Sequence, residues 1–137
     1  MADRVRKVKY CYVSVPNRAG RGTEILEALQ DAQVDLLAFT GFPAKQGSQL
    51  DFVTEDLPGL RRVAKENDWR LSKVKKGFLI QGTDRIGAAW RHIRKLADRK
   101  INVTAADAVA AGKGRYGMIL WVKPKDYARA ARALGAK

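Results

Sequence analysis

The segment Gly82-Thr83-Asp84-Arg85-Ile86-Gly87-Ala88 joins an apolar run to a helical pattern. Shifting the sequence by 67 positions, without a gap, aligns this segment with residues 15–21, and the match continues on both sides. An internal repeat of this kind indicates one supersecondary unit that is built twice. The identical pairs are Arg18 and Arg85, Gly20 and Gly87, Leu29 and Leu96, Asp31 and Asp98, Ala38 and Ala105, Gly47 and Gly114, and Arg62 and Arg129.

The first copy, residues 1–76, predicts two strand–helix–strand segments. Strands are expected where β-branched and aromatic residues gather or where polarity alternates, and helices where apolar residues recur every three or four positions. The expected strands cover residues 8–15, 34–42, 50–54 and 69–76, and the expected helices cover residues 23–32 and 57–67.

The second copy, residues 77–137, repeats the order but stops early. Strands are expected over 78–81, 101–109 and 116–123, and a last helix begins near Pro124. The helix between the first two strands is expected to direct one apolar face inward, formed by Ile86, Trp90, Ile93 and Leu96 or Ala97. The counterpart of strand 69–76 would fall beyond Lys137, so this copy lacks its last strand.

The combined pattern predicts an α+β protein, a tandem repeat of the ferredoxin-like βαββαβ unit. A missing strand leaves unpaired backbone groups at a sheet edge, and such an edge must be covered. We expect the cover to come from the basic N-terminal segment, from the first copy or from a second chain.

Three short segments in each copy resemble the ACT domains, which are βαββαβ modules that bind amino acids and related metabolites and often regulate enzymes. In copy two the pattern is Gly82 to Ala88, then Ile93 to Ala97, then Lys100-Ile101-Asn102-Val103. In copy one it is Val13 to Gly20, then Ile25 to Leu29, then Val34-Asp35-Leu36. The resemblance implies that ligands lie between paired units, against the turn from strand to helix and the start of the next strand.

The residues themselves suit a zwitterionic ligand. Gly20 and Gly87 precede helices whose first N–H groups and dipole favour a carboxylate. Arg18 and Arg85 can add a guanidinium fork, and Asp84, Asp35 or Asn102 can accept hydrogen bonds from an ammonium group. The candidate ligand-binding residues are Asp84, Arg85, Gly87 and Asn102 in copy two and Asn17, Arg18, Gly20 and Asp35 in copy one.

A second interpretation of the same turns needs no ligand. Glycine suits a turn from strand to helix for backbone reasons alone. Asp84 can also be explained as the cap of the helix that begins near Ile86. Both interpretations stay open at this stage.

No catalytic site is expected. His92 lies between Arg91 and Ile93 on the polar side of its helix, so we expect a solvated surface histidine. Cys11 is expected to be a small buried apolar residue within a strand. One cysteine and one histidine cannot form a zinc cluster, and neither a dinucleotide fingerprint nor a phosphate-binding loop is present, so we expect no metal and no cofactor.

The formal net charge of +13 is the main argument for another function. Such a surplus attracts nucleic acid or other anions. The basic residues are distributed along the sequence, which favours a solvated surface over one groove. Gly114 to Trp121 faintly resembles an RNA-recognition strand motif, but Met118 and Leu120 stand where stacking rings would be needed.

The sequence therefore predicts a small, non-catalytic regulatory protein that binds an amino acid at the interface between ACT-like units. Homodimerisation through a sheet edge is expected, and binding of nucleic acid is the alternative function. No secretion signal and no run of about 20 apolar residues is found, so we expect a cytoplasmic protein that does not enter membranes.

Overall fold

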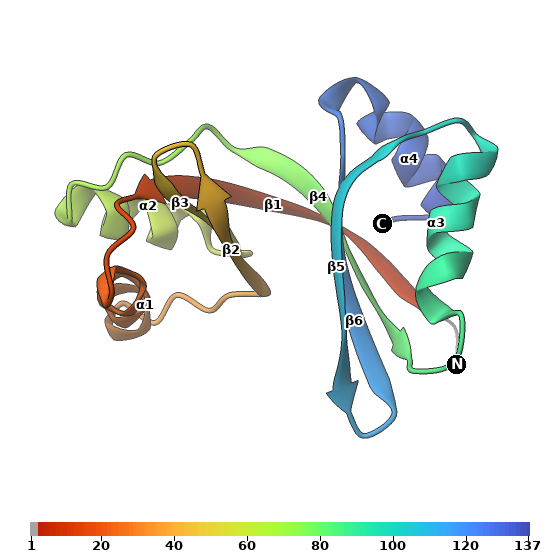
Figure 1. Cartoon of the computed structure of the whole chain (residues 1–137), viewed down its shortest axis with the longest axis horizontal. Coiled ribbons are helices and arrows are strands. Elements are labelled where there is room, and N and C mark those ends of the chain that lie inside the picture. The colour runs from red at the N-terminus through yellow and green to blue at the C-terminus, as the bar shows by residue number, and fades with distance from the viewer. Residues whose placement is uncertain (1–2) are drawn as a thin grey trace. The chain divides into compact units, whose positions relative to one another are not determined.

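The structure, a computed structural model, describes residues 3–137 (Figure 1). Its contacts form two compact units. One unit comprises Lys9–Lys75, and the other comprises Lys76–Lys137 together with residues 3–8. We predicted a division into 1–76 and 77–137, and the structure differs from it because residues 3–8 group with the second unit.

The unit Lys9–Lys75 is a three-stranded sheet with two helices. It contains the second part of β1 (Arg4–Val15), α1 (Arg21–Asp31), β2 (Ala38–Ala44), β3 (Gly47–Val53) and α2 (Leu57–Glu66). Strand β3 pairs antiparallel with β1 and with β2, so that Phe52 lies opposite Cys11 on one side and Phe39 on the other. Phe52, Ile25 and Leu60 are fully buried in one apolar cluster, which holds both helices against the sheet.

The prediction of a last strand over residues 69–76 is wrong for most of this range. Residues 69–74 carry no strand assignment, although the Ser72 amide donates to the Tyr12 carbonyl over 2.9 Å. The Tyr12 amide in turn donates to the Ser72 hydroxyl instead of to a backbone carbonyl. The segment therefore lies beside β1, but a side chain interrupts the regular ladder. The strand predicted over 34–42 also begins later, at Ala38.

The second unit contains β4 (Lys75–Thr83), α3 (Ala88–Asp98), β5 (Val103–Gly112), β6 (Arg115–Val122), a short 3-10 helix η1 (Pro124–Asp126) and α4 (Tyr127–Leu134). Strand β6 pairs antiparallel with β4 and with β5. The core beneath α3 and α4 includes the fully buried Phe78, Leu96 and Leu120. The predicted α+β fold and the order βαββα of the second copy are confirmed.

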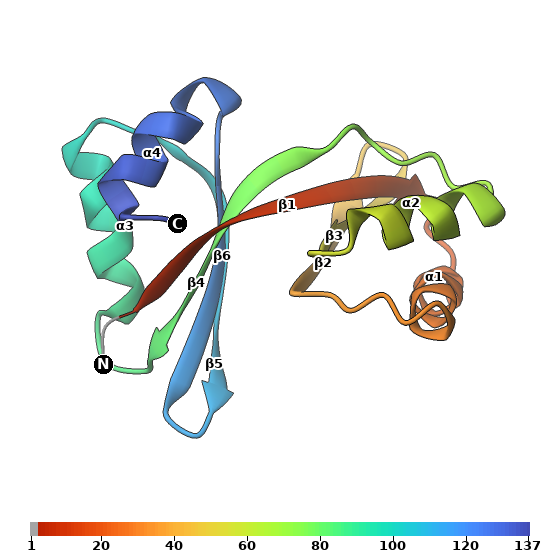
Figure 2. The same ribbon diagram turned by 180° about the vertical axis from the view of Figure 1, so that it is seen from behind.

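The N-terminal part of β1 supplies the strand that the second copy lacks. Strand β1 is the neighbour of β4 in the sheet, and Figure 2 shows the N-terminal part of β1 next to β4. Val5 belongs to the core of the unit, and its carbonyl accepts a hydrogen bond of 3.1 Å from the Lys137 amide. Of the three covers expected for the open edge, the basic N-terminal segment is the one the structure contains.

Helix α3 buries only part of the face that we predicted, since Leu96 is fully buried and Ile93 packs against the core but Ile86 and Trp90 are exposed. Its buried residues are Ala88, His92 and Leu96, whereas Ile86 is 105% exposed and Trp90 is 61% exposed. The predicted surface position of His92 is wrong, because the side chain is only 4% exposed and lies 2.6 Å from a carboxylate oxygen of Asp3. The predicted burial of Cys11 is confirmed.

Candidate functional site

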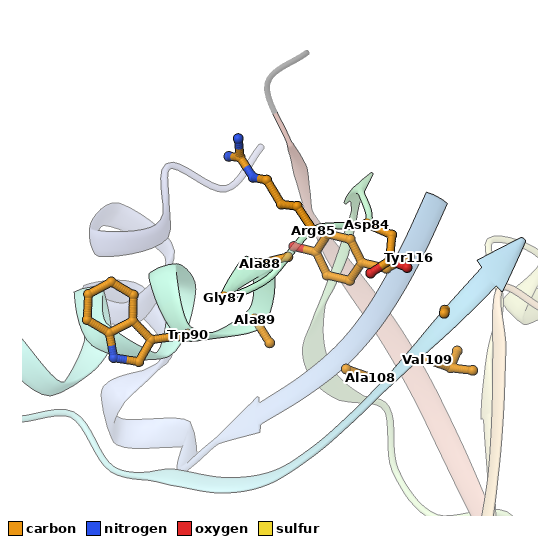
Figure 3. A pocket seen from close by; sticks show the side chains of 10 residues that line it. Asp84, Arg85, Gly87, Ala88, Ala89, Trp90, Ala108, Val109 and Tyr116 are labelled. Carbon is orange, nitrogen blue, oxygen red and sulfur yellow. The ribbon is translucent and has the colours of Figure 1, made fainter. Parts of the chain in front are cut away.

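A cavity of about 280 Å³ lies at the start of α3 (Figure 3). Three of the predicted ligand-binding residues, Asp84, Arg85 and Gly87, line it. The structure thus gathers three of the four candidates of copy two around one space.

Gly87 lines the cavity without filling it, because it has no side chain. It is the N-cap of α3 with φ 79, a left-handed conformation that glycine adopts easily. A Cβ atom built at this position would meet nothing within 4 Å. No side chain caps α3, so Asp84 does not cap the helix as one interpretation of the sequence proposed. The first turn of α3 therefore has backbone N–H groups without a side-chain acceptor.

Strands β5 and β6 supply the opposite wall. Ala108, Val109 and Ala110 of β5 and Tyr116 of β6 line the cavity, together with Trp90 of α3. Sequence reasoning missed these residues. The signal was the glycine turn between the two strands, because a hairpin closed there places Ala110 opposite Tyr116, as the structure does.

A buried polar cluster lies behind the Tyr116 wall. Asp3 Oδ2 accepts hydrogen bonds from the Tyr116 hydroxyl over 2.7 Å, from His92 Nε2 over 2.6 Å and from Arg91 Nη2 over 3.1 Å. Burial raises the pKa of Asp3, but the hydrogen bonds from His92 and Tyr116 and the charges of His92 and Arg91 outweigh it and lower that pKa. Burial and the bond to Asp3 raise the pKa of Tyr116. At neutral pH an ionised Asp3 therefore holds a protonated Tyr116 in the cavity wall.

The matching turn of copy one is arranged differently. Gly20 is the N-cap of α1 with φ 89 and open space around it, as expected from the repeat. Asn17 and Arg18 are exposed, and Arg18 Nη1 donates to Glu24 Oε1 over 3.4 Å. Hydrogen bonds from Arg21 and Arg18 lower the pKa of Glu24. In this copy the arginine of the motif already has an acidic partner.

Asp35 and Asn102, the strand-start candidates, lie at the other ends of their helices. Asp35 lines a different cavity, of about 430 Å³, beside Leu26 and Leu29 of α1. Asn102 is exposed and follows α3, whose 11 residues span about 16 Å from Gly87. One small ligand cannot contact both ends of α3 within a unit. The ligand roles of Asp35 and Asn102 stay predictions.

Across the described part of the chain, residues 3–137, no three or more histidine, cysteine, aspartate or glutamate side chains are grouped so that they could hold a metal ion. Among its helices, none has the length and apolar character needed to cross a membrane.

The chain matches no protein-family model and no curated protein at a significant level. Solved structures do match. A protein of Bacteroides thetaiotaomicron superimposes with a TM-score of 0.77 and 16% identity over 97% of this chain and 88% of that one. The regulatory subunit of aspartate kinase from Thermus flavus has a TM-score of 0.59 and 18% identity over 98% of this chain and 94% of its own.

A third match is Escherichia coli aspartokinase III, solved in complex with lysine and aspartate. It has a TM-score of 0.59 and 12% identity, and the match covers 98% of this chain but 32% of the enzyme. At identities of only 12% to 18%, the TM-scores of 0.59 to 0.77 show a common fold. The chain therefore has an ACT-like α+β fold shared with the regulatory subunit of aspartate kinase, as the resemblance of its two repeated turns predicted.

Proposed function

We propose that this chain is a non-catalytic regulatory protein that binds an amino acid or a similar small metabolite at the start of α3. The observation that carries the proposal is the meeting of Asp84, Arg85 and Gly87 around one cavity. Its volume, about 280 Å³, is close to the lower end of the range of roughly 300–1,000 Å³ for ligand pockets. A compact metabolite suits a space of this size.

The lining offers a partner for each part of a zwitterion. The uncapped N–H groups of α3 and the positive end of its dipole favour the carboxylate, and the exposed Arg85 can turn to form a second contact with it. Asp84 can accept hydrogen bonds from the ammonium group. Val109 and the alanines of β5 provide an apolar surface for the ligand side chain.

A second copy of the chain would close this site. Strand β5 is the edge of its sheet, and its residues 104–112 are all exposed. The three most exposed large apolar side chains of the described chain are Ile86, Val109 and Trp90, which lie in or next to the cavity lining. A copy paired along β5 would cover apolar surface and complete the edge. We therefore propose a homodimer with ligand bound at this interface.

The comparisons support a regulatory role without chemistry. The matched proteins include one named as a regulatory subunit and one solved with two amino acids bound. A ligand between two copies shifts the pairing equilibrium because it contacts one arrangement better than another. Such a shift is the physical means by which the protein would report the ligand to a partner.

A thermal-shift screen against the amino acids tests the proposal. A ligand at 100 times its dissociation constant stabilises by about 2.7 kcal/mol, which gives a clear rise in melting temperature. Gly87→Asn should remove the rise, because asparagine tolerates the left-handed backbone and its side chain fills the open space.

Gly20→Asn is the matched control, since Gly20 has the same backbone conformation and equally open surroundings in copy one. It should leave the ligand-induced rise unchanged. The proposal is wrong if no amino acid raises the melting temperature, or if both variants respond to the ligand like the unaltered chain.

A further inference from the structure

The positive charge belongs almost entirely to one of the two units. The unit formed by residues 3–8 and Lys76–Lys137 contains 17 of the 27 lysine and arginine residues but only 5 of the 14 acidic residues, a net charge of +12. The unit Lys9–Lys75 contains the remaining 10 basic and 9 acidic residues, a net charge of +1. The sequence pattern alone had suggested a charge spread along the whole chain, and this interpretation is corrected.

The balanced unit is an internal control for the basic one. Both units repeat the same βαββα order of elements, belong to one chain and meet the same solvent. A general adaptation to salt, pH or solubility would bias both of them. A surplus confined to one unit opposes its own compact state through self-repulsion, so we expect it to serve a partner of that unit.

The unit cannot neutralise this charge internally. Three of its five carboxylates are already engaged: Asp3 by Arg91 and His92, Asp98 by Arg94, and Asp126 by Arg129. Even if Asp84 and Asp107 each paired with one cation, 12 positive charges would exceed the acidic ones. An external anion is the remaining source of neutralisation.

Many of these cations lie on the layer formed by α3 and α4. The two helices are side by side in both views, and Arg129 Nη1 of α4 donates to the Arg99 carbonyl at the end of α3 over 3.3 Å. We define the basic helical surface by six exposed side chains. They are Arg94, Lys95, Arg99, Lys100, Arg129 and Arg132.

We propose that the basic helical surface binds the phosphate backbone of a nucleic acid. Many separate cations on one layer match a polymer with a charge at every repeat better than a single anionic metabolite. An anionic membrane is less favoured because, of the three exposed large apolar residues of this unit, only Trp90 borders the surface, where Arg94 lies over its ring at 5.7 Å, while Ile86 and Val109 lie outside α3 and α4. This inference does not depend on the amino-acid site, because none of the six cations lines the cavity at the start of α3.

Fluorescence anisotropy with a short labelled duplex DNA and a single-stranded RNA of mixed sequence tests the inference in the full chain. If six phosphates are contacted, duplex affinity should fall roughly a thousandfold as salt rises from about 50 to about 200 mM. The triple variant Lys95→Gln, Arg99→Gln, Arg132→Gln should weaken binding at least about tenfold and reduce the slope of log K against log salt by about 3.

The matched control removes three exposed cations from α2 of the balanced unit: Arg61→Gln, Arg62→Gln and Lys65→Gln. Binding and salt slope should stay as in the unaltered chain, and circular dichroism should show both variants folded. The inference is overturned if neither nucleic acid binds, if both triple variants lose affinity equally, or if phosphatidylserine vesicles are bound while nucleic acid is not.

Discussion

Asp3 is the residue on which the second unit's N-terminal strand depends. Its side chain is 4% exposed and joins the strand to Tyr116 of β6 and to His92 and Arg91 of α3. It also lies directly over Gly82, where an added Cβ would collide with the carboxylate. A single carboxylate therefore links three elements that are distant in sequence.

Replacing Asp3 by asparagine should destabilise the chain at neutral pH by about 1–3 kcal/mol, because buried donors lose their charged acceptor. The pKa of Asp3 is lowered in the folded state from its usual 3.8, so its contribution is fully present above that value and is lost as pH falls through the folded pKa. Urea unfolding over a series of pH values should show the two free energies of unfolding converging below about pH 4.

Asp98→Asn is the control for this prediction. Asp98 pairs with Arg94 on the surface of α3, with both side chains more than half exposed, and such a pair contributes only about 0.3–0.5 kcal/mol. An Asp3→Asn variant as stable as Asp98→Asn at neutral pH would contradict the role given to the cluster.

Cys11 and His92 show what can and cannot be predicted from neighbouring residues in the sequence. The burial of Cys11 follows from its place in an apolar strand and was predicted correctly. His92 has cationic and apolar neighbours along its helix, and nothing nearby indicates burial. Its partner Asp3 lies 89 positions away, so only the tertiary structure reveals it.

At the scale of elements, the repeat predicted the helices and most strands because a shared periodicity supports each assignment twice. The failure at residues 69–74 has a local cause, since the Ser72 hydroxyl takes the place of a backbone acceptor beside β1. The inward face of α3 was assigned correctly at Ile93 and Leu96 and wrongly at Ile86 and Trp90. Ile86 precedes the helix and Trp90 lies in its first turn, in or next to the cavity lining, where a partner rather than the core would bury them.

The exposed edge strand β5 is the element through which we expect the chain to dimerise. Val109→Glu places a charge on the exposed edge strand, where Val109 is 67% exposed, and should shift the protein from dimer to monomer. Light scattering after size exclusion measures the change. The cost to folding should be small, because the side chain is mostly in solvent before dimerisation.

Phe42→Glu is the matched substitution on β2, the edge strand of the other unit, where Phe42 is 44% exposed. It should leave the dimer intact if pairing uses β5. A monomeric unaltered chain, or dissociation caused by Phe42→Glu and not by Val109→Glu, would refute pairing along β5.

At the scale of the whole molecule, the chain is not two consecutive modules. Strand β1 runs from Arg4 to Val15, and its first residues complete the unit formed by the C-terminal half. The sequence shows the repeat and gave this N-terminal cover only as one of three expectations, because one uninterrupted strand gives no sign of where one unit ends. The uneven charge is partly visible from the halves alone, since Lys76–Lys137 carries +10 and the rest of the chain +3, and counting residues 3–8 with Lys76–Lys137 sharpens the difference to +12 and +1.

The candidate site was predictable in part for a related reason. Asp84, Arg85 and Gly87 are neighbours in sequence and lie in a repeated motif, so a local pattern identified them. Tyr116 and Val109 reach the cavity through strand pairing, which a short motif does not encode. The resemblance to ACT domains therefore indicated the turn at the start of α3, and only the folded structure identified the strand residues that line the rest of the cavity.

The most direct test of the account is a ¹H–¹⁵N NMR titration of the full chain with the amino acid that gives the largest thermal shift. The account predicts saturable shifts of the amide signals of Gly87, Ala88, Ala89 and Trp90 and of the β5 residues Ala108 to Ala110, with the matching Gly20 turn unaffected. Shifts confined to other parts of the chain, or no shift with any amino acid, would contradict it.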